Sequence, residues 1–498
     1  MVTTPFRGEH WELSYGHEYA AGTTAAGLKG FLGIFDRANL PDPEIEWQPI
    51  YGAGGMTNRG MFRNIRGNWT MSGGVSDVIM LSGAPLQYLY GTKCYSWGAQ
   101  YTGMDTYITG DVAAGATQIA VNAAGSIAVG HIIQIGLTPD GSRQDFELKR
   151  PEVRTVSNVS GSTITFLEPL RHSHTAANSG ADSGKAKRIN PAHANAYYGH
   201  LILEDTTLPT MTWLSSMWRA GDASNAPTLI RRYTGGKVAR GSIRMEEGER
   251  VRYNFDDIIF TDMRYNDERD NPFASTTDPS GGKYLNSLTA SAPTIPTIDP
   301  FFASSVSVYY NPDNTTGITT GNQITSVRNL QLEVNNNAEA RYYVAGHDPA
   351  TPTAHSVLEG NREYTLTMNV DSQDSNFYAD MLEASQQTLS SVTDITGFQM
   401  RFFINRDQSV TNNAAAFSVD WKDGIRIDIP EPVNTATSTA MAHASTYKGD
   451  LSASNQGAIL RTGGLAPGGD PVVQQEMEFS VKSSRVEVHD QSTWETTI

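Results

Sequence analysis

Neighbouring carboxylates are the residues of this sequence that most readily suggest chemistry. Asp256 and Asp257 adjoin each other, and Glu246, Glu247 and Glu249 gather in one short stretch. Two carboxylates that flank a glycosidic bond can act as the acid and the base of its hydrolysis. Adjacent residues of a β-strand point to opposite faces, however, so Asp256 and Asp257 are not expected to flank one sugar bond. We interpret all five as acids displayed on a surface.

Histidines are the candidate metal ligands. His172 and His174 lie two residues apart, and His193 and His200 follow downstream. A structural zinc site needs about four nitrogen, sulfur or carboxylate ligands at defined spacing. These histidines lie in sequence rich in Ser, Ala and Gly, without a carboxylate at helical spacing. We therefore expect surface histidines and no metal.

A short acidic stretch matches a calcium-binding loop only in part. Asp371, Asp374 and Asn376 offer oxygen ligands, but the Gly and the terminal Glu that such a loop requires are missing. The sequence also lacks a phosphate-binding Gly-Lys-Thr loop, a dinucleotide-binding Gly pattern and a Gly-x-Ser-x-Gly nucleophile motif. We predict no catalytic residue, no cofactor and no enzymatic activity.

The five acids belong to a predicted hairpin from Gly235 to Tyr265. We expect a turn at Gly235 and Gly236, a first strand, an acidic turn over Glu246–Glu249, and a second strand from about Val251. Alternation with period two gives such strands one buried and one wet face. The expected buried residues are Val238, Ile243, Met245, Val251, Tyr253 and Phe255, and the expected wet ones are Arg250, Arg252 and Asn254.

Composition favours a turn-rich β protein of several domains. The chain has 498 residues, of which 39% are hydrophobic, with 46 Gly and 23 Pro. Its formal net charge is −16. A dedicated nucleic-acid binder needs clustered Lys and Arg to displace counterions, so this balance argues against one. It is compatible with a protein that nucleic acid must pass without sticking, because like charges repel.

The single cysteine and the absence of long apolar runs exclude further classes. Cys94 alone cannot form an intramolecular disulfide, and its aromatic neighbours Tyr90, Tyr95 and Trp97 favour a buried thiol. The first residues contain no apolar segment typical of a secretory signal, and no stretch has the roughly 18 apolar residues that span a membrane.

The sequence is divided into five predicted segments. Residues rich in Ala, Gly, Val and Ile interrupt strand-like sequence that later resumes, which indicates a small all-β domain inserted at an exposed loop. A stretch with many Pro, Asp, Ser and Thr indicates a linker or an extended arm. The segments are residues 1–106 (first part of domain 1), 107–190 (inserted all-β domain), 191–270 (second part of domain 1), 271–300 (linker or arm) and 301–498 (domain 2).

The two large domains follow one predicted plan. In domain 1 a Gly-bearing strand, RNIRGNWTMSGGVSDVIML, leads into a short apolar helix, PLQYLYG. In domain 2 the alternating strand EYTLTMNV leads into an expected short helix that contains Phe377, Met381 and Leu382. The segments FQMRFFINR and AAFSVDWKDGIRIDIPE then correspond in order and patterning to the strands at 208–218 and 237–260. One final alternating strand is expected over Met477–His489.

Together these features resemble a viral protein family. They are the start Glu12-Leu13-Ser14-Tyr15-Gly16, the strand and helix over 66–91, the strand GGKVARGSIRMEEGERVRYNF, the strand SVRNLQLEVNNN and the final alternating strand. In this order they look like the major tail tube proteins of long-tailed (siphovirus-like) bacterial and archaeal viruses that carry two tube-fold halves. The inserted segment 107–190 resembles β modules of other viral structural proteins.

The resemblance implies a fold, an assembly and a place in the virion. Each half would be a β-sandwich or barrel whose strands join those of neighbouring chains in a closed ring, and rings would stack into a helical tube in the viral tail. Two halves per chain imply a trimeric, pseudo-hexameric ring. Tape-measure and tail-terminator proteins would be partners, and genomic DNA would pass through the lumen without specific binding. Residues 16–44 and 266–300 are candidates for reaching the next ring.

The resemblance also gives the five acids a role. Glu246, Glu247, Glu249, Asp256 and Asp257 become candidates for lumen-facing or inter-ring positions, because an acidic lumen offers DNA no phosphate-binding cations. Two alternatives stay open. One is another β-rich virion component, such as a capsid or baseplate protein. The other is a glycan-binding adhesin, which the insertion and the 21 Tyr and 8 Trp residues would suit.

Overall fold

The structure is a computed structural model, and it describes part of the chain. The described residues are 6–19, 21, 37–41, 44–51, 61–98, 101–137, 143–176, 182–189, 198–219, 229–266, 299–311, 323–343, 354–371, 399–406, 424–429, 432–433, 446–447, 458–466, 474–481, 483–490 and 493–494. They form a mainly β protein, as the composition predicted. No helix among them is long and apolar enough to cross a membrane.

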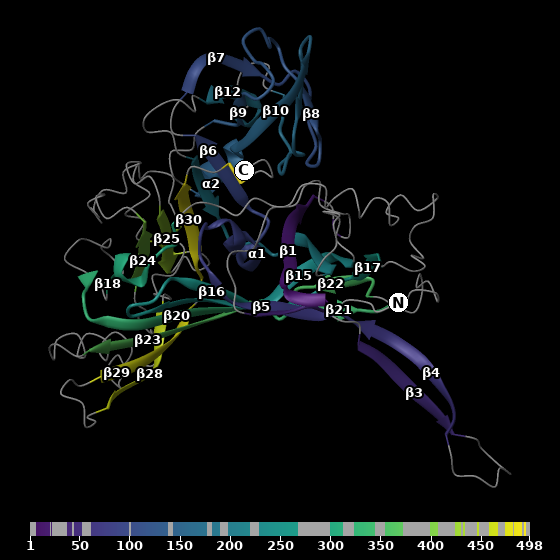
Figure 1. Ribbon diagram of the computed structural model, residues 1–498. Coiled ribbons are helices and arrows are strands. Elements are labelled where there is room, and N and C mark those ends of the chain that lie inside the picture. The colour runs from purple at the N-terminus through teal and green to yellow at the C-terminus, as the bar shows by residue number, and fades with distance from the viewer. Residues whose placement is uncertain are drawn as a thin grey trace.

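A large antiparallel sheet spans the body of the molecule (Figure 1). Its main path has the order β2-β5-β16-β15-β20-β23-β29-β28. The bounds are β2 (Arg37–Asn39), β5 (Ser72–Ile79), β16 (Arg252–Ile259), β15 (Leu229–Glu246), β20 (Val327–Asn335), β23 (Glu363–Asp371), β29 (Gln474–Val481) and β28 (Ala458–Ala466). The junction between β15 and β20 joins the two halves of the chain through main-chain hydrogen bonds.

A second antiparallel sheet of seven strands also mixes the two halves. Its order is β19-β18-β24-β25-β30-β13-β6. The bounds are β19 (Gln323–Ile324), β18 (Val306–Asn311), β24 (Gln399–Asn405), β25 (Gly424–Ile429), β30 (Arg485–Asp490), β13 (Tyr198–Ile202) and β6 (Cys94–Gly98). The final alternating stretch, predicted as one strand, is therefore two. β29 lies in the large sheet, and β30 lies in this second sheet.

The strand order of the large sheet is the same in both halves of the chain. The first half contributes β2-β5-β16-β15 and the second contributes β20-β23-β29-β28. If the four strands of each set are numbered by their order in the chain, their spatial order across the sheet is 1-2-4-3 in both sets. Between the second and third strands of each set comes a pair that joins the other sheet, β6 with β13 and β24 with β25. The described strands thus repeat one topology.

The apolar faces of the two sheets pack on each other and enclose the main core. Ile243 and Leu366 from the large sheet belong to it, together with Phe402, Ile427 and Val488 from the second sheet. All five are at most 1% exposed. Burial of such side chains is the main favourable term in folding, so the two halves are stabilised by one shared core.

The prediction of a chain-reversing turn at Gly235 and Gly236 is wrong, because β15 continues through these residues as one strand. The first part of β15 pairs with β14 (Thr210–Arg219) and β17 (Asp262–Asn266), and its second part pairs with β16 and β20. Gly235 has a φ of +69°, and a side chain on Gly236 would meet the ring of Phe260. The glycines bend a strand that serves two regions of the sheet. β14 also pairs with β1 (Phe6–Glu18).

Several other local predictions are confirmed. The second strand of the predicted hairpin is β16, and Val251, Tyr253 and Phe255 are buried in it or next to it. The short apolar helix is present as the 3-10 turn η1 (Ala84–Leu86) followed by α1 (Gln87–Tyr90). Cys94 is a buried free thiol.

Residues 101–189 contain a separate six-stranded sheet with its own core (Figure 1). Its order is β7-β12-β9-β10-β11-β8, and an isolated bridge between Ile108 and Val121, just beyond β7 and β8, brings its two outer strands together in a barrel-like arrangement. The bounds are β7 (Tyr101–Tyr107), β8 (Gln118–Ala120), β9 (Ile132–Ile135), α2 (Arg143–Lys149), β10 (Glu152–Ser160), β11 (Thr163–Phe166), η2 (Asp182–Gly184) and β12 (Lys185–Ile189). We call this unit the barrel module.

Polar and aromatic contacts fix the barrel module to the body. Arg171 donates to the side-chain oxygen of Gln87 at 2.6 Å, and the ring nitrogen of His172 lies 2.8 Å from the carbonyl oxygen of Cys94. Phe146 packs between the rings of Tyr95 and Trp97. The module is therefore held in a defined orientation on β6.

A two-stranded hairpin extends away from both sheets, at the lower right of Figure 1. It consists of β3 (Glu44–Tyr51) and β4 (Met61–Thr70), and we call it the arm. Two further small ribbons are β21 (Glu339–Arg341) with β22 (Ser356–Leu358), and β26 (Pro432–Val433) with β27 (Thr446–Tyr447). The 3-10 turn η3 (Ala303–Ser305) precedes β18.

Some predictions fall outside the described residues. They include Asp374 and Asn376, the short helix with Phe377, Met381 and Leu382, His193, and nearly all of the linker 271–300. The segment boundaries proposed from the sequence stay predictions.

We predict that Asn336, at the junction of the two halves, contributes strongly to stability. Its buried side-chain amide donates to the carbonyl oxygens of Leu89 at 3.2 Å and Val238 at 3.0 Å. Asn336→Ala would remove both hydrogen bonds and lower the free energy of unfolding by about 1–3 kcal/mol. Urea denaturation measures this. The control is Asn329→Ala on the exposed side of β20, and an equal loss in both variants would contradict the prediction.

Candidate functional site

The large sheet has a polar face on the side opposite the core. Alternation in β20 buries Leu330, Leu332 and Val334 and turns Gln331 and Glu333 outward. The same alternation holds in β23 and β29. Because these strands are paired in register, their outward residues form rows across the sheet. We call this surface the polar face.

Acids outnumber bases among the described residues of the polar face. Cross-strand rows place Glu333 opposite Ser242 and Thr365, and Thr367 opposite Glu478. The acids are Asp77, Glu246, Asp256, Asp257, Glu333, Glu363, Asp371, Glu476 and Glu478, and the bases are Arg240, Arg244, Arg252 and Arg328. The surface therefore carries net negative charge from β5 to β29.

Three of the five predicted acids lie at the end of the β15–β16 hairpin, with Glu246 at the margin of the polar face and Glu247 and Glu249 in the turn beyond it. Glu247 and Glu249 are exposed in the turn, and Glu246 is half-buried at the end of β15. Glu246 forms an ion pair with Arg244, and Glu249 forms one with Arg252 at 3.3 Å. The negative charge of this acidic stretch is therefore partly neutralised by arginines, which the sequence alone did not indicate.

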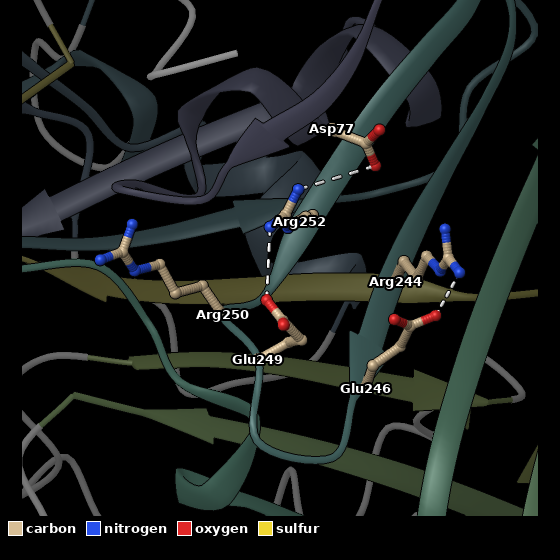
Figure 2. Close-up of a pocket in the computed structure, with 6 residues that line it drawn as sticks. All are labelled: Asp77, Arg244, Glu246, Glu249, Arg250 and Arg252. Atoms are coloured by element: carbon tan, nitrogen blue, oxygen red, sulfur yellow. Dashed lines mark hydrogen bonds and ion pairs between the residues drawn. The ribbon is translucent and has the colours of Figure 1, made fainter. Parts of the chain in front are cut away.

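These ion pairs surround a shallow recess of about 250 Å³ (Figure 2). Arg244 and Arg252 stand directly opposite each other on β15 and β16, where two like charges repel unless acids separate them. Arg252 also lies 4.0 Å from Asp77. Arg250 extends away from the pairs in Figure 2 and makes no ion pair with another described residue. The recess is a mixed-charge surface.

The other two predicted acids, Asp256 and Asp257, lie together where the strand is irregular. The register of β15 with β16 shifts on both sides of Arg240, which pairs with Asp257. Both aspartates are accordingly exposed or half-buried, while Phe255 and Ile258 on either side are buried. The prediction that the two point to opposite faces is wrong, because a β-bulge interrupts the alternation.

Electrostatics within this bulge disfavours the two charged carboxylates. Burial raises the pKa of Asp256, and Arg240 offsets part of that rise. Glu333, Asp257 and Asp77 raise it further, because like charges destabilise the ionised form. Burial likewise raises the pKa of Asp257, with Arg240 lowering it. Asp256, Asp257 and Glu333 thus lie close enough for their like charges to raise the pKa of Asp256.

Sequence reasoning missed Glu333, Glu476 and Glu478. Each alternates with buried apolar residues, in QLEVN and EMEFSV, so period two alone would have turned them outward. The sequence did not show that β20 and β29, which carry these acids, lie in the same sheet as β15 and β16.

The histidine prediction is wrong for His174 and His200, which are almost completely buried. The ring nitrogens of His174 lie 2.7 Å from the carbonyl oxygen of Ser183 and 2.6 Å from a carboxylate oxygen of Glu152. Burial alone would raise the pKa of Glu152, but Arg154 and His174 lower it well below its usual range. Burial lowers the pKa of His172 to about 4. No metal-binding group of His, Cys, Asp and Glu occurs among the described residues.

A second buried polar group has the composition of a nucleophilic triad. The hydroxyl of Ser96 lies 2.8 Å from Nδ1 of His200, whose Nε2 lies 3.4 Å from a carboxylate oxygen of Asp490. The ring of His200 stacks on Trp494 at 3.8 Å between centroids, and Trp494 donates to Asp490. All four residues are less than 10% exposed. We interpret the group as a packing element that connects β6, β13 and the end of β30.

The third buried group is a network of charges on the second sheet. Asp428 accepts hydrogen bonds from Arg401 at 2.5 Å and from Arg485 at 3.1 Å, and Glu487 pairs with Arg426. Burial would raise the pKa of Asp428, but the surrounding arginines lower it well below its usual range. Buried acids with such partners stay charged and hold their strands in register.

No family model matches the chain, and no curated protein is similar to it in sequence.

We predict that Asp256→Asn stabilises the protein at neutral pH. A carboxyl whose pKa is raised on folding binds protons more tightly in the folded state, so its charge opposes folding above that pKa. The urea midpoint of Asp256→Asn should exceed that of the natural chain at pH 7, and the gain should disappear below about pH 4. Glu247→Gln, in the exposed turn, is the control. A lower midpoint for Asp256→Asn at pH 7 would overturn the prediction.

Proposed function

We propose that the chain is a virion structural protein that polymerises as stacked rings into a tail tube, through which genomic DNA leaves the capsid. The observation that carries this proposal is the large sheet. Two successive sets of four strands, in the same order, make one sheet that is apolar toward the core and has a face with excess acids from β5 to β29 on the other side. This is what a channel wall made of repeated units requires.

The edges of the large sheet support ring formation. Along the main path the described strands end at β2 on one side and at β28 on the other, each paired on one side only. Unpaired edges favour association, and closed rotational symmetry removes them all. With two strand sets per chain, three chains would supply six sets, which gives a trimeric, pseudo-hexameric ring.

The charge of the polar face supports its assignment to the lumen. DNA carries a dense row of phosphates, which bind where Lys and Arg are free to replace counterions. On this face Arg244, Arg252 and Arg328 each pair with an acid, at Glu246, Glu249 and Asp371 respectively. A wall of this kind repels the duplex along its whole length, so DNA would slide without specific binding.

The arm supports stacking of the rings. A two-stranded hairpin that packs against nothing is only marginally stable in water. The arm would therefore be stabilised by a surface of another chain. Trp47 on the arm is 55% exposed in the single chain. A second copy of the chain in the adjacent ring would bury it. Aromatic residues at such contacts contribute large buried areas.

The resemblance described above adds the remaining context. A protein of this kind would be located in the tail of the virion, with tape-measure and tail-terminator proteins as further partners. The alternatives are another β-rich virion component, such as a capsid or baseplate protein, and a glycan-binding adhesin. Polymerisation distinguishes them, because only a tube protein forms long hollow filaments.

We predict that the purified chain forms hollow tubes with three-fold rings. Negative-stain electron microscopy with end-on views classified by symmetry measures this directly. Three-fold tubes would support both the function and the two-set architecture. Six-fold tubes would keep the function and overturn the count of chains. A chain that stays monomeric at high concentration would favour the capsid, baseplate or adhesin alternatives.

We also predict that reversing charge on the polar face creates DNA binding. In tubes of the Glu476→Lys, Glu478→Lys double variant, lysines would replace acids in neighbouring rows of the lumen wall. DNA should then be retained in these tubes and released by salt, because counterion release drives phosphate binding. Passage of DNA through the tubes and its co-sedimentation with them are the measurements. Glu247→Lys, in the hairpin turn, is the matched control, and free passage through both variants would refute the lumen assignment.

A further inference from the structure

The arm leaves the large sheet next to β2 and β5, and its angle to the sheet is set at this base. The arm continues a ribbon of the large sheet, in which Asn39 of β2 is paired with Gly74 of β5. Pairing resumes in the arm at Glu44 and Thr70. Between these two pairs no described residue of β2 pairs with one of β5, whereas Ser72 and Gly73 stay paired with β16. The base of the arm is therefore tied to the large sheet through β5 alone among the described strands.

One side chain from the other half of the molecule contacts this base. The hydroxyl of Tyr342 donates to the carbonyl oxygen of Trp69 at 2.7 Å, and it lies 3.3 Å from the hydroxyl of Thr70, which can donate in turn. Both partners are in the last two residues of β4. Tyr342 therefore contacts the arm at its base, where a small displacement becomes a large one at the tip.

Tyr342 is itself held by a rigid support. It follows β21, whose ribbon with β22 packs on the large sheet through an apolar cluster that includes Ala239, Ile259 and Val357. Lys237 of β15 adds a hydrogen bond to the carbonyl oxygen of Val357 at 2.9 Å. It also forms an ion pair with Glu359 at 2.6 Å. The hydroxyl of Tyr342 is thus fixed relative to the central strand of the sheet.

We propose that Tyr342 is a positioning residue that sets the angle of the arm, and that this angle decides how readily copies of the chain stack. The first part stands on the contacts just described. The second part rests on the proposed tube function. The partner of the arm is a second copy of this chain, and Tyr342 acts on it only through the arm.

Distances between spin labels test the first part without any assembly. One label is placed on the arm by Pro49→Cys and the other on the sheet by Glu363→Cys, both exposed positions, while the natural Cys94 is buried. The variant is Tyr342→Phe, which removes only the hydroxyl. Its matched control is Tyr343→Phe, because Tyr343 is exposed and its ring contacts His355. We expect a broader distance distribution for Tyr342→Phe and an unchanged one for Tyr343→Phe.

Polymerisation of the unlabelled variants tests the second part. Tyr342→Phe should raise the protein concentration needed for tubes by about three- to tenfold, because loss of the hydrogen bond lowers the fraction of chains whose arm is held at the angle that stacking requires. Tyr342→Ala, which also removes the ring, should raise it further. Tyr343→Phe should assemble like the natural chain.

The two readouts separate the possible failures. An unchanged distance distribution in Tyr342→Phe would overturn the positioning role. A broader distribution with normal polymerisation would overturn the link to stacking. If the natural chain never polymerises, the tube function fails, while the distance measurement still decides whether Tyr342 sets the angle of the arm.

Discussion

The pairing of β15 with β20 is the constraint on which the rest of the structure depends. It runs from Arg240 with Asn335 to Glu246 with Asn329, and it joins strands that are about ninety residues apart in the chain. Without it the large sheet would divide into a sheet of seven strands and a sheet of four, each with an additional edge. With it, the polar face is continuous, and the apolar faces of both halves cover one core. Asn336, just after β20, secures the same junction from the side.

The bend in β15 follows from that constraint. A strand that must pair with β14 and β17 at its start and with β16 and β20 at its end has to change direction between them. Gly235 accommodates a positive φ there, and Gly236 allows Phe260 to approach the backbone. Local glycine chemistry and the long-range junction therefore serve one arrangement, in which a single strand belongs to two regions of the sheet.

Local alternation was predictable from the sequence, and long-range order was not. Val251, Tyr253 and Phe255 are buried as period two indicated, and the short helix after β5 is present. The bulge at Asp256 and Asp257 was missed, because an extra residue in one strand is visible only beside its partner. His174 and His200 were placed on the surface because their neighbours in sequence are small and polar. Their actual surroundings come from Glu152, Ser96 and Trp494, which are distant in sequence and close only after folding.

The barrel module shows how the two ends of an insertion can meet. Ile189 at the end of β12 pairs with Tyr101 at the start of β7, so the chain leaves the module beside the point where it enters. β6 and β13, which the module separates in sequence, remain paired neighbours. The connection between β6 and β13 can therefore accept an inserted domain. A different compact domain with adjacent termini could replace the barrel module while β6 and β13 stay paired. Such a graft would have to cover Tyr95 and Trp97, which Phe146 now shields, and it would be displayed once per chain.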